Sequence, residues 1–359
     1  MSILPVNGIR IGSTAAGIRY QGRDDLVVIE CQSGTNCAAV FTRNRFSAAP
    51  VQIAKQHLSQ TSPRALLINS GNANAGTGEQ GFLNTIECCR MLADDLGCDV
   101  SEVLPFSTGV IGEQLPVQAF RQALPNCLKN LSADADAWAR ASKTIMTTDT
   151  VAKLFSRKAD IGGTEVTVTG MSKGAGMIRP DMATMLAYIA TDAVIEKTVL
   201  QRLLNEATRV SFNRITVDGD TSTNDACTLL ATGTAKMAAI SEDSKEYDQF
   251  STVLTALMKD LAQAIIRDAE GASKFITINI SGGESEDDCL VVGYTVAESP
   301  LVKTALFASD PNWGRILAAV GRAPVSELEI GQVSIRMNDL AIVTAGEPDP
   351  GYTEEAGQL

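Results

Sequence analysis

Short runs of β-branched and other apolar residues, each followed by turn-forming residues, are the feature that most constrains the fold of this chain. Residues 26–30 (LVVIE), 38–42 (AAVFT) and 66–69 (LLIN) have the length and composition of strands, and Gly, Ser or Asn ends each run. The first third of the chain therefore begins with predicted strands separated by turns.

After these runs the hydrophobic period changes to that of a helix. Phe82, Ile86, Cys89 and Leu92 recur every three to four residues, and Gly97 offers a C-terminal cap. Helical spacing also predicts helices at residues 117–124, 135–146, 197–212 and 248–268. Alternation predicts further strands at residues 165–169 (EVTVT), 275–280 (FITINI) and 290–296 (LVVGYTV).

Strands and helices in this mixture predict an α/β chain, and the order of the strands in a sheet stays open. The most linker-like stretch, residues 281–288 (SGGESEDD), is too short to mark a domain boundary. We find no low-complexity segment and no internal repeat.

Composition excludes several classes of function. Acidic residues outnumber basic ones by 42 to 30, and a formal charge of -12 opposes binding to nucleic acid. The eight cysteines form no C-x-x-C pair and only one histidine could join them, so we expect reduced thiols and no metal site or disulfide framework.

No basic segment followed by an apolar run begins the chain, and no stretch reaches the about 18 apolar residues of a membrane span, so we expect a cytoplasmic protein with no membrane partner.

A glycine-rich junction follows the strand predicted at residues 165–169. Residues 170–187 read GMSKGAGMIRPDMATMLA, where three glycines and Pro180 interrupt regular structure and let backbone groups approach a ligand. The spacing fits neither the P-loop nor the dinucleotide-binding motif. On these residues alone a structural turn explains the junction, with Lys173 solvated and Thr184 an ordinary threonine in the first turn of a helix.

The same junction resembles the cleavage site of the ornithine acetyltransferase family of arginine biosynthesis, whose members cut their own Ala-Thr bond in M-A-T-M-L. Seven other segments resemble the family in the same order: AAVFTRNRFSAAPV, NSGNANAGTGEQG, STGVIGEQLP, MTTDT, SFNRITVDGDTSTND, RDAEGASK and SDPNWGRILAAVGRA. The resemblance covers nearly the whole chain. It implies an ArgJ/DmpA-like fold of β-sheets sandwiched by helices, of the self-cleaving N-terminal-nucleophile type.

Cleavage between Ala183 and Thr184 would have a chemical purpose. A threonine hydroxyl needs a base, and the freed α-amino group, with a pKa of about 7.7 to 8.0, can serve as one. By resemblance, Thr184 attacks the acetyl carbonyl of N-acetylornithine, holds the acetyl group as an ester and passes it to glutamate by ping-pong transfer. Thr108 and Gly109 match the family's oxyanion-hole pair, although a turn that closes a strand also explains them.

The resemblance further implies substrate contacts at Thr147, Lys173, Thr184 and Glu270. A zwitterionic amino acid needs a cation for its carboxylate and an anion for its amine, and Lys173 and Glu270 supply one of each. Residues 218–225 (DGDTSTND) look like calcium ligands but lack the Gly at position 6 and the Glu at position 12 of an EF-hand. We therefore expect a hydrogen-bonded turn there.

Several expectations concern the chain as a whole. The resemblance implies two interwoven pieces, residues 1–183 and 184–359, assembled as a heterotetramer of two α and two β chains. The family's C-terminal segment D-L-S-x-D-Y-V-x-x-N-A-x-Y-x-T, which carries two further substrate ligands, has no match here, so we expect a truncated second piece. The alternatives are an N-terminal-nucleophile amidohydrolase or aminopeptidase, in which water accepts the acyl group, and a catalytically impaired relative. No bound cofactor is expected, and use of acetyl-CoA as a co-substrate stays open.

Overall fold

The computed structural model describes residues 2–179 and 185–358, and the chain divides into two compact units. The first is Met1–Glu270 and the second is Gly271–Leu359. Each unit has its own hydrophobic core.

Two sheets form the centre of the first unit. The first has the order β1 (Ile9–Thr14), β2 (Leu26–Cys31), β4 (Ala65–Asn72), β5 (Val103–Val110). The second has the order β3 (Asn36–Phe41), β9 (Ala226–Ala231), β8 (Leu186–Thr191), β7 (Thr164–Lys173), β6 (Lys153–Ile161). Neighbours are antiparallel except for the parallel pairs β4–β5 and β8–β9.

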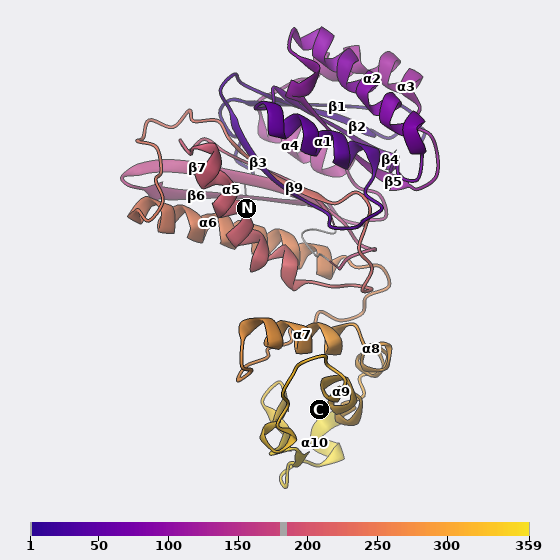
Figure 1. Cartoon of the computed structure of the whole chain (residues 1–359), viewed down its shortest axis with the longest axis vertical. Coiled ribbons are helices and arrows are strands. Elements are labelled where there is room, and N and C mark those ends of the chain that lie inside the picture. Colours follow the sequence, from indigo (N-terminus) through magenta and orange to yellow (C-terminus); the bar gives the residue numbers. More distant parts are fainter. Residues whose placement is uncertain (1, 180–184, 359) are drawn as a thin grey trace. The chain divides into compact units, whose positions relative to one another are not determined.

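Among the described residues of the first unit, six helices pack against the two sheets. They are α1 (Ala49–Gln60), α2 (Gly78–Leu96), α3 (Val117–Lys129), α4 (Ala135–Thr144), α5 (Lys197–Arg209) and α6 (Lys245–Arg267), with short 3-10 turns η1 (Val100–Glu102) and η2 (Phe212–Arg214). In Figure 1, α2 and α3 lie outside the first sheet and α6 lies outside the second, while α1 and α4 lie between these layers. The expected sandwich of β-sheets and helices is confirmed.

Alternation along the strands explains how the sheets stack. In β2, Val27 and Ile29 belong to the core between the sheets, whereas Leu26 and Val28 pack under α2 and α3. Successive side chains of a strand point to opposite faces, so a strand covered on both sides must be apolar at nearly every position. This is why the strand runs read as continuous apolar segments.

Local signals set the ends of the predicted helices. Asp134 accepts a hydrogen bond from the Ala137 N–H at the start of α4, and Ser244 accepts one from the Tyr247 N–H at the start of α6. Gly97 follows α2 with a φ of 62°, the left-handed cap that its position predicted. These helices match the ranges expected from the sequence to within a few residues.

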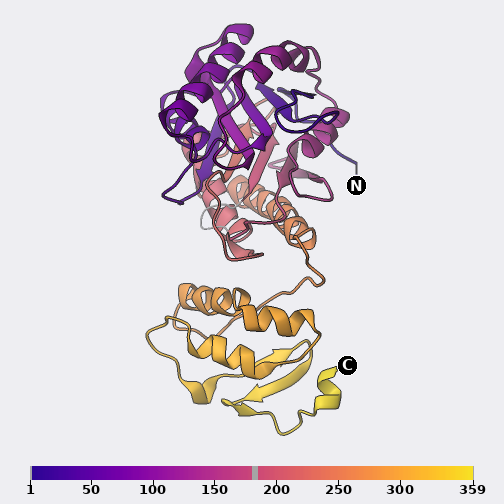
Figure 2. The same cartoon turned by 90° about the vertical axis from the view of Figure 1, so that its right-hand side faces the viewer.

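The second unit combines helices with a small sheet. Its elements are α7 (Glu286–Ala297), α8 (Pro300–Phe307), α9 (Trp313–Gly321), η3 (Ile330–Gln332), β10 (Ile335–Met337), β11 (Leu340–Thr344), β12 (Glu347–Pro348) and α10 (Glu354–Gln358). Figure 2 shows its longer helices on one side of the sheet. Val292, Val296, Val302, Ala319 and Val320 form its buried core.

Two predicted strands in this unit are wrong. Residues 290–296 lie inside α7, because Ser285 caps a helix start by accepting from the Asp288 N–H and three acidic residues occupy the first turn. Residues 275–280 belong to no helix or strand. Their alternation is strand-like, but a strand also needs a hydrogen-bonded neighbour, and these residues pair with no strand among those described.

The cysteine side chains are reduced, and the described helices are short or polar. All eight cysteines are free thiols within the described residues, and six of them are buried. In this part of the chain no single helix is long and apolar enough to cross a membrane; α7 and α8 pass the length and composition test only as a pair bent by 60°.

Candidate active site

A cavity of about 390 Å³ lies in the first unit where strand ends of the two sheets meet. Gly71 and Gly109 come from the ends of β4 and β5, Lys173 from the end of β7, and Leu186 from the start of β8. The structure brings five of the expected site residues together in its wall: Thr108, Gly109, Thr147, Lys173 and Glu270. The volume suits a small-molecule substrate.

An irregular pairing shapes the wall at Thr108 and Gly109. The β4–β5 register shifts at Asn72, which faces both Thr108 and Val110. Gly109 has a φ of 135°, and a Cβ there would lie 2.2 Å from the backbone carbon of Gly71. Only glycine fits this close approach of two strands, and such irregularities commonly re-aim the backbone beside functional sites.

Asn224 joins the two sheets behind this wall. Its side-chain amide donates to the Ala73 carbonyl at 2.6 Å and to the Ser107 carbonyl at 2.9 Å. The segment just before β9 is thereby tied to the residue before Thr108. The 218–225 turn is hydrogen-bonded as predicted: Asp218 accepts from the Met177 and Ile178 N–H groups at 2.6 and 3.0 Å.

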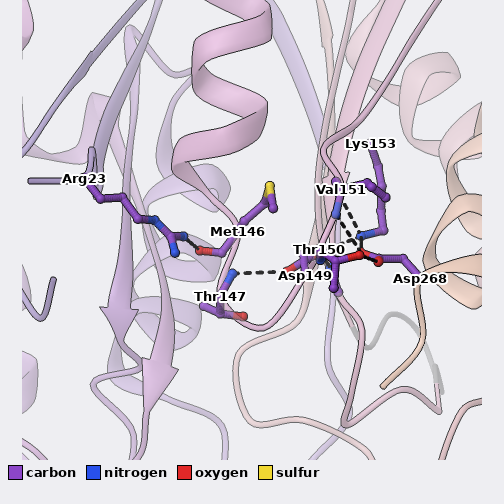
Figure 3. Close-up of polar contacts among 9 residues, drawn as sticks. Arg23, Met146, Thr147, Asp149, Thr150, Val151, Lys153 and Asp268 are labelled. Atoms are coloured by element: carbon purple, nitrogen blue, oxygen red, sulfur yellow. Dashed lines mark hydrogen bonds and ion pairs between the residues drawn. The ribbon is translucent and has the colours of Figure 1, made fainter. Parts of the chain in front are cut away.

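A buried ion-pair network supports the loop that carries Thr147 (Figure 3). Lys153 Nζ lies 2.7 Å from Asp149 Oδ1 and 2.6 Å from Asp268 Oδ2. Asp149 also accepts from the Thr147 N–H at 3.1 Å and from the Gly174 N–H at 2.6 Å, and Asp268 accepts from the Thr150 hydroxyl and N–H. One network therefore fixes the Thr147 loop, the residue after Lys173, and the end of α6 two residues before Glu270.

The pKa values follow from this arrangement. Burial by itself raises the pKa of Asp149, but the charges of Lys173 and Lys153 outweigh it and hold that pKa below its usual range. Burial also raises the pKa of Asp268, but the hydrogen bonds from Lys153 and Thr150 outweigh this effect, so the pKa of Asp268 is lowered as well. Burial lowers the pKa of Lys173, although nearby carboxylates oppose the shift.

Glu270 is placed by the loop that follows β7. Its N–H donates to the Ala175 carbonyl at 2.9 Å, and a Cβ on Gly176 would lie 2.7 Å from Glu270 Cδ. Gly176 therefore leaves the space that the Glu270 carboxylate occupies.

The predicted cleavage bond itself lies outside the described residues, since both Ala183 and Thr184 do. Met185, the next residue in sequence, lines the cavity and its carbonyl accepts from the Ala226 N–H at 3.0 Å.

Sequence reasoning missed the supporting residues. Asp149 and Asp268 stand inside the MTTDT and RDAEGASK segments, and Lys153 follows Asp149 at a spacing of four. Asp225 reads from the sequence only as a turn residue, although it is 3% exposed and lines the cavity. The sequence signal that could have identified Asp149 and Asp268 is their position two residues from Thr147 and Glu270 in the same motifs.

Comparison with known proteins gives a consistent result. The family model described as "ArgJ family" matches residues 10–358. The arginine biosynthesis bifunctional protein ArgJ of Methylococcus capsulatus is 52% identical over 355 residues, which cover 99% of this chain and 86% of the relative. The protein of the same name from Pseudomonas syringae pv. tomato is 52% identical over 354 residues, covering 98% and 87%.

Two solved structures are also similar. One is the crystal structure of the bifunctional protein ArgJ from Bacillus halodurans, 32% identical, with a TM-score of 0.48 over 51% of this chain and 95% of that chain. The other is an ornithine acetyltransferase from Mycobacterium tuberculosis complexed with ornithine, 31% identical, with a TM-score of 0.45 over 51% and 96%. Neither alignment reaches a TM-score of 0.5, so the assignment depends on the family match and the sequence relatives. The match over residues 10–358 and the 52% identity along nearly the whole chain make this protein a member of the ArgJ family.

Proposed function

We propose that this protein is a glutamate N-acetyltransferase of arginine biosynthesis that moves the acetyl group of N-acetylornithine to glutamate through an acetyl-threonine ester. The observation that carries the proposal is the cavity itself. It gathers a cation, an anion and a glycine-bearing strand end beside Met185, the neighbour of Thr184.

Thr184 is the proposed nucleophile, and cleavage between Ala183 and Thr184 supplies its base. The freed α-amino group has an ordinary pKa close to neutral pH, so it can take the hydroxyl proton. No other base is required of the cavity wall for this step.

Thr108 and Gly109 form the proposed oxyanion hole. The tetrahedral oxyanion needs donors that are already in place, and the pairing of β5 with β4 positions this backbone in the cavity wall. The side-chain amide of Asn224 also supports this backbone, because it donates a hydrogen bond to the Ser107 carbonyl at 2.9 Å.

Thr147, Lys173, Thr184 and Glu270 are the proposed substrate contacts. Lys173 attracts a carboxylate and Glu270 attracts an ammonium group, so the two together suit an amino acid. The Asp149–Lys153–Asp268 network supports this role, because it holds Thr147 and the backbone next to Lys173 in place.

The two pieces of a cleaved chain would share the second sheet. In the order β3-β9-β8-β7-β6, β9 and β8 follow residue 184 while the strands on both sides of them precede it. This supports interwoven pieces 1–183 and 184–359 that stay together after cleavage. We further propose the heterotetramer, a cytoplasmic location, and acetyl-CoA as an additional acetyl donor, in keeping with the word bifunctional in the relatives' names.

Mass spectrometry tests the proposal. The purified protein is expected as two pieces, residues 1–183 and 184–359, and N-acetylornithine should add one acetyl group to the second. Added glutamate should then remove the acetyl group and yield N-acetylglutamate. Thr184→Ala is expected to stay intact and inert, whereas Thr184→Ser keeps a hydroxyl and should be cleaved.

Two results would contradict the proposal. An intact wild-type chain that takes up no acetyl group would exclude the threonine mechanism. Release of free acetate with no N-acetylglutamate would favour an amidohydrolase instead.

A further inference from the structure

Asp225 is a buried carboxyl group in the cavity wall that the mechanism above does not use. The residue is 3% exposed, and it precedes β9 in the segment that Asn224 ties to the first sheet. Oδ2 is shielded from solvent and has no hydrogen-bond partner among the residues that the structure describes. An unsatisfied buried carboxyl oxygen is costly and calls for a role.

Its position relates it to the reaction centre. In the second sheet, Leu186 at the start of β8 faces Lys173 of β7 on one side and Ala226 of β9 on the other. Lys173 and Asp225 therefore flank the start of β8, which begins two residues after the proposed nucleophile in sequence. Both residues line the cavity together with Thr108.

The chemistry of the proposed transfer leaves a proton unassigned. Glutamate arrives with its α-amino group protonated at neutral pH, and an ammonium group has no lone pair with which to attack an ester. Ornithine leaves as a free amine and must gain a proton to become the stable ammonium form. One group that takes up a proton in one half-reaction and gives it back in the other would serve both needs.

We propose that Asp225 carries this proton between the two half-reactions, an inference that rests on the proposed acetyl transfer. In the first half-reaction the protonated carboxyl gives its proton to the departing ornithine amine and becomes a carboxylate. In the second, the carboxylate takes a proton from the glutamate ammonium group; the freed amine attacks the ester, the new C–N bond forms, and the C–O bond to Thr184 breaks. The proton lost by the new amide nitrogen returns to the threonine oxygen through the α-amine, so the cycle closes with no net proton.

The electrostatic surroundings agree with this role. Burial raises the pKa of Asp225 well above its usual value, while hydrogen bonds from Ser222 and the charge of Lys173 act in the opposite direction. The other charged groups near Lys173 are Asp149, Lys153 and Glu270. A raised pKa lets this carboxyl hold a proton more readily than an ordinary aspartate does, as the carrier requires.

The test compares two acceptors on the acetylated enzyme. Asp225→Asn keeps the shape of the side chain but cannot exchange the proton. Transfer to glutamate is expected to fall by roughly 10²-fold or more, whereas transfer to hydroxylamine, an amine that is largely unprotonated at neutral pH, should stay close to wild type. Asp220→Asn, the same substitution at an exposed site of the same loop, is the matched control and should change neither rate.

The outcomes are separable. An equal loss with both acceptors, or no loss with glutamate, would overturn the role of Asp225, and failure of the wild type to take up acetyl would instead overturn the proposed function. If Asp225→Asn is not cleaved, the wild-type ratio of glutamate to hydroxylamine transfer is measured against pH, with hydroxylamine counted in its neutral form. A ratio that levels off below the pKa of the glutamate amine supports the carrier, and one that rises about tenfold per pH unit up to that pKa, as for unassisted attack by free amine, contradicts it.

Discussion

At the scale of single residues, the position of the Glu270 side chain in the cavity depends on a glycine beside it. Gly176 leaves room for the Glu270 carboxylate, and a Cβ would intrude to 2.7 Å. Because that carboxylate ends a flexible side chain, Gly176→Ala should displace it at little cost in stability. The KM for N-acetylornithine is expected to rise several-fold with an unchanged urea midpoint. Gly331→Ala, where a Cβ meets nothing within 4 Å, is the control, and an unaltered KM in Gly176→Ala would remove Glu270 from the binding site.

Lys153 holds two carboxylates together in a buried setting. Its side chain is 1% exposed, and its partners Asp149 and Asp268 are 0% and 5% exposed. Lys153→Met leaves both acids without their cation, and breaking a buried pair in this way costs about 3–5 kcal/mol. Lys158→Met breaks only the exposed pair with Glu165 and should cost less than about 1 kcal/mol. Urea unfolding of the two variants measures the difference, and equal losses would contradict the buried network.

The same carboxylates predict a loss of stability in acid. The pKa values of Asp149 and Asp268 are lower in the folded state than in the unfolded state, where they are about 3.9. Their contribution to the free energy of unfolding is therefore complete above about pH 3.9 and is lost as the pH falls through the folded-state pKa values. The urea midpoint should therefore decline below about pH 4. Asp268→Asn should start from a lower midpoint near neutral pH and converge with wild type in acid. Parallel curves would show that Asp268 carries no such linkage.

At the scale of elements, the packing of α6 on β7 is tight at one glycine. A Cβ on Gly170 would lie 3.0 Å from Ile189 and Leu257 and 3.2 Å from Leu261. Gly170→Ala is expected to cost about 1–3 kcal/mol by overpacking, and Leu257→Ala about 2–5 kcal/mol by leaving a cavity. The double variant should cost less than the sum by at least about 0.5 kcal/mol, because each change relieves the other.

A second double-mutant cycle, in which Leu254 replaces Leu257, is the control for this coupling. Leu254 is also buried on α6 but is not among the nearest atoms to Gly170. Gly170→Ala and Leu254→Ala should therefore add. Urea unfolding of both cycles provides the measurement, and additivity in the Leu257 cycle would mean that α6 shifts freely to accept the methyl group.

At the scale of the whole molecule, the division at Glu270 predicts where a protease cuts first. Residues 271–280 form no helix or strand and nearly all are exposed. Exposed chain of this kind enters a protease site without local unfolding. Brief digestion with subtilisin should cut between residues 271 and 285 and leave a fragment that ends just beyond Glu270, as read by mass spectrometry. First cuts inside β4 or β5 would contradict this organisation.

Part of the site could be predicted from the sequence because its residues stand in contiguous motifs. Thr108, Gly109, Thr147, Lys173 and Glu270 are all expected from these motifs, and the cavity contains them. Asp149 and Asp268 stand in the same motifs, but their shared ion pair with Lys153 was not predicted, since it joins positions 115 residues apart. A buried ion pair leaves no periodic or local pattern in the sequence.

The sequence by itself determined five helices (α2 to α6), four strands (β2, β3, β4 and β7) and the family, because hydrophobic period, caps and motifs act over a few neighbouring residues. At residues 290–296 the strand-like composition is misleading, because the acidic helix start outweighs it. The tertiary structure decided that β8 and β9 lie between β3 and β7, that Lys153 bridges two distant acids, and that Asp225 is buried in the cavity. Strand pairing and loss of solvent depend on groups that meet only after the chain has folded.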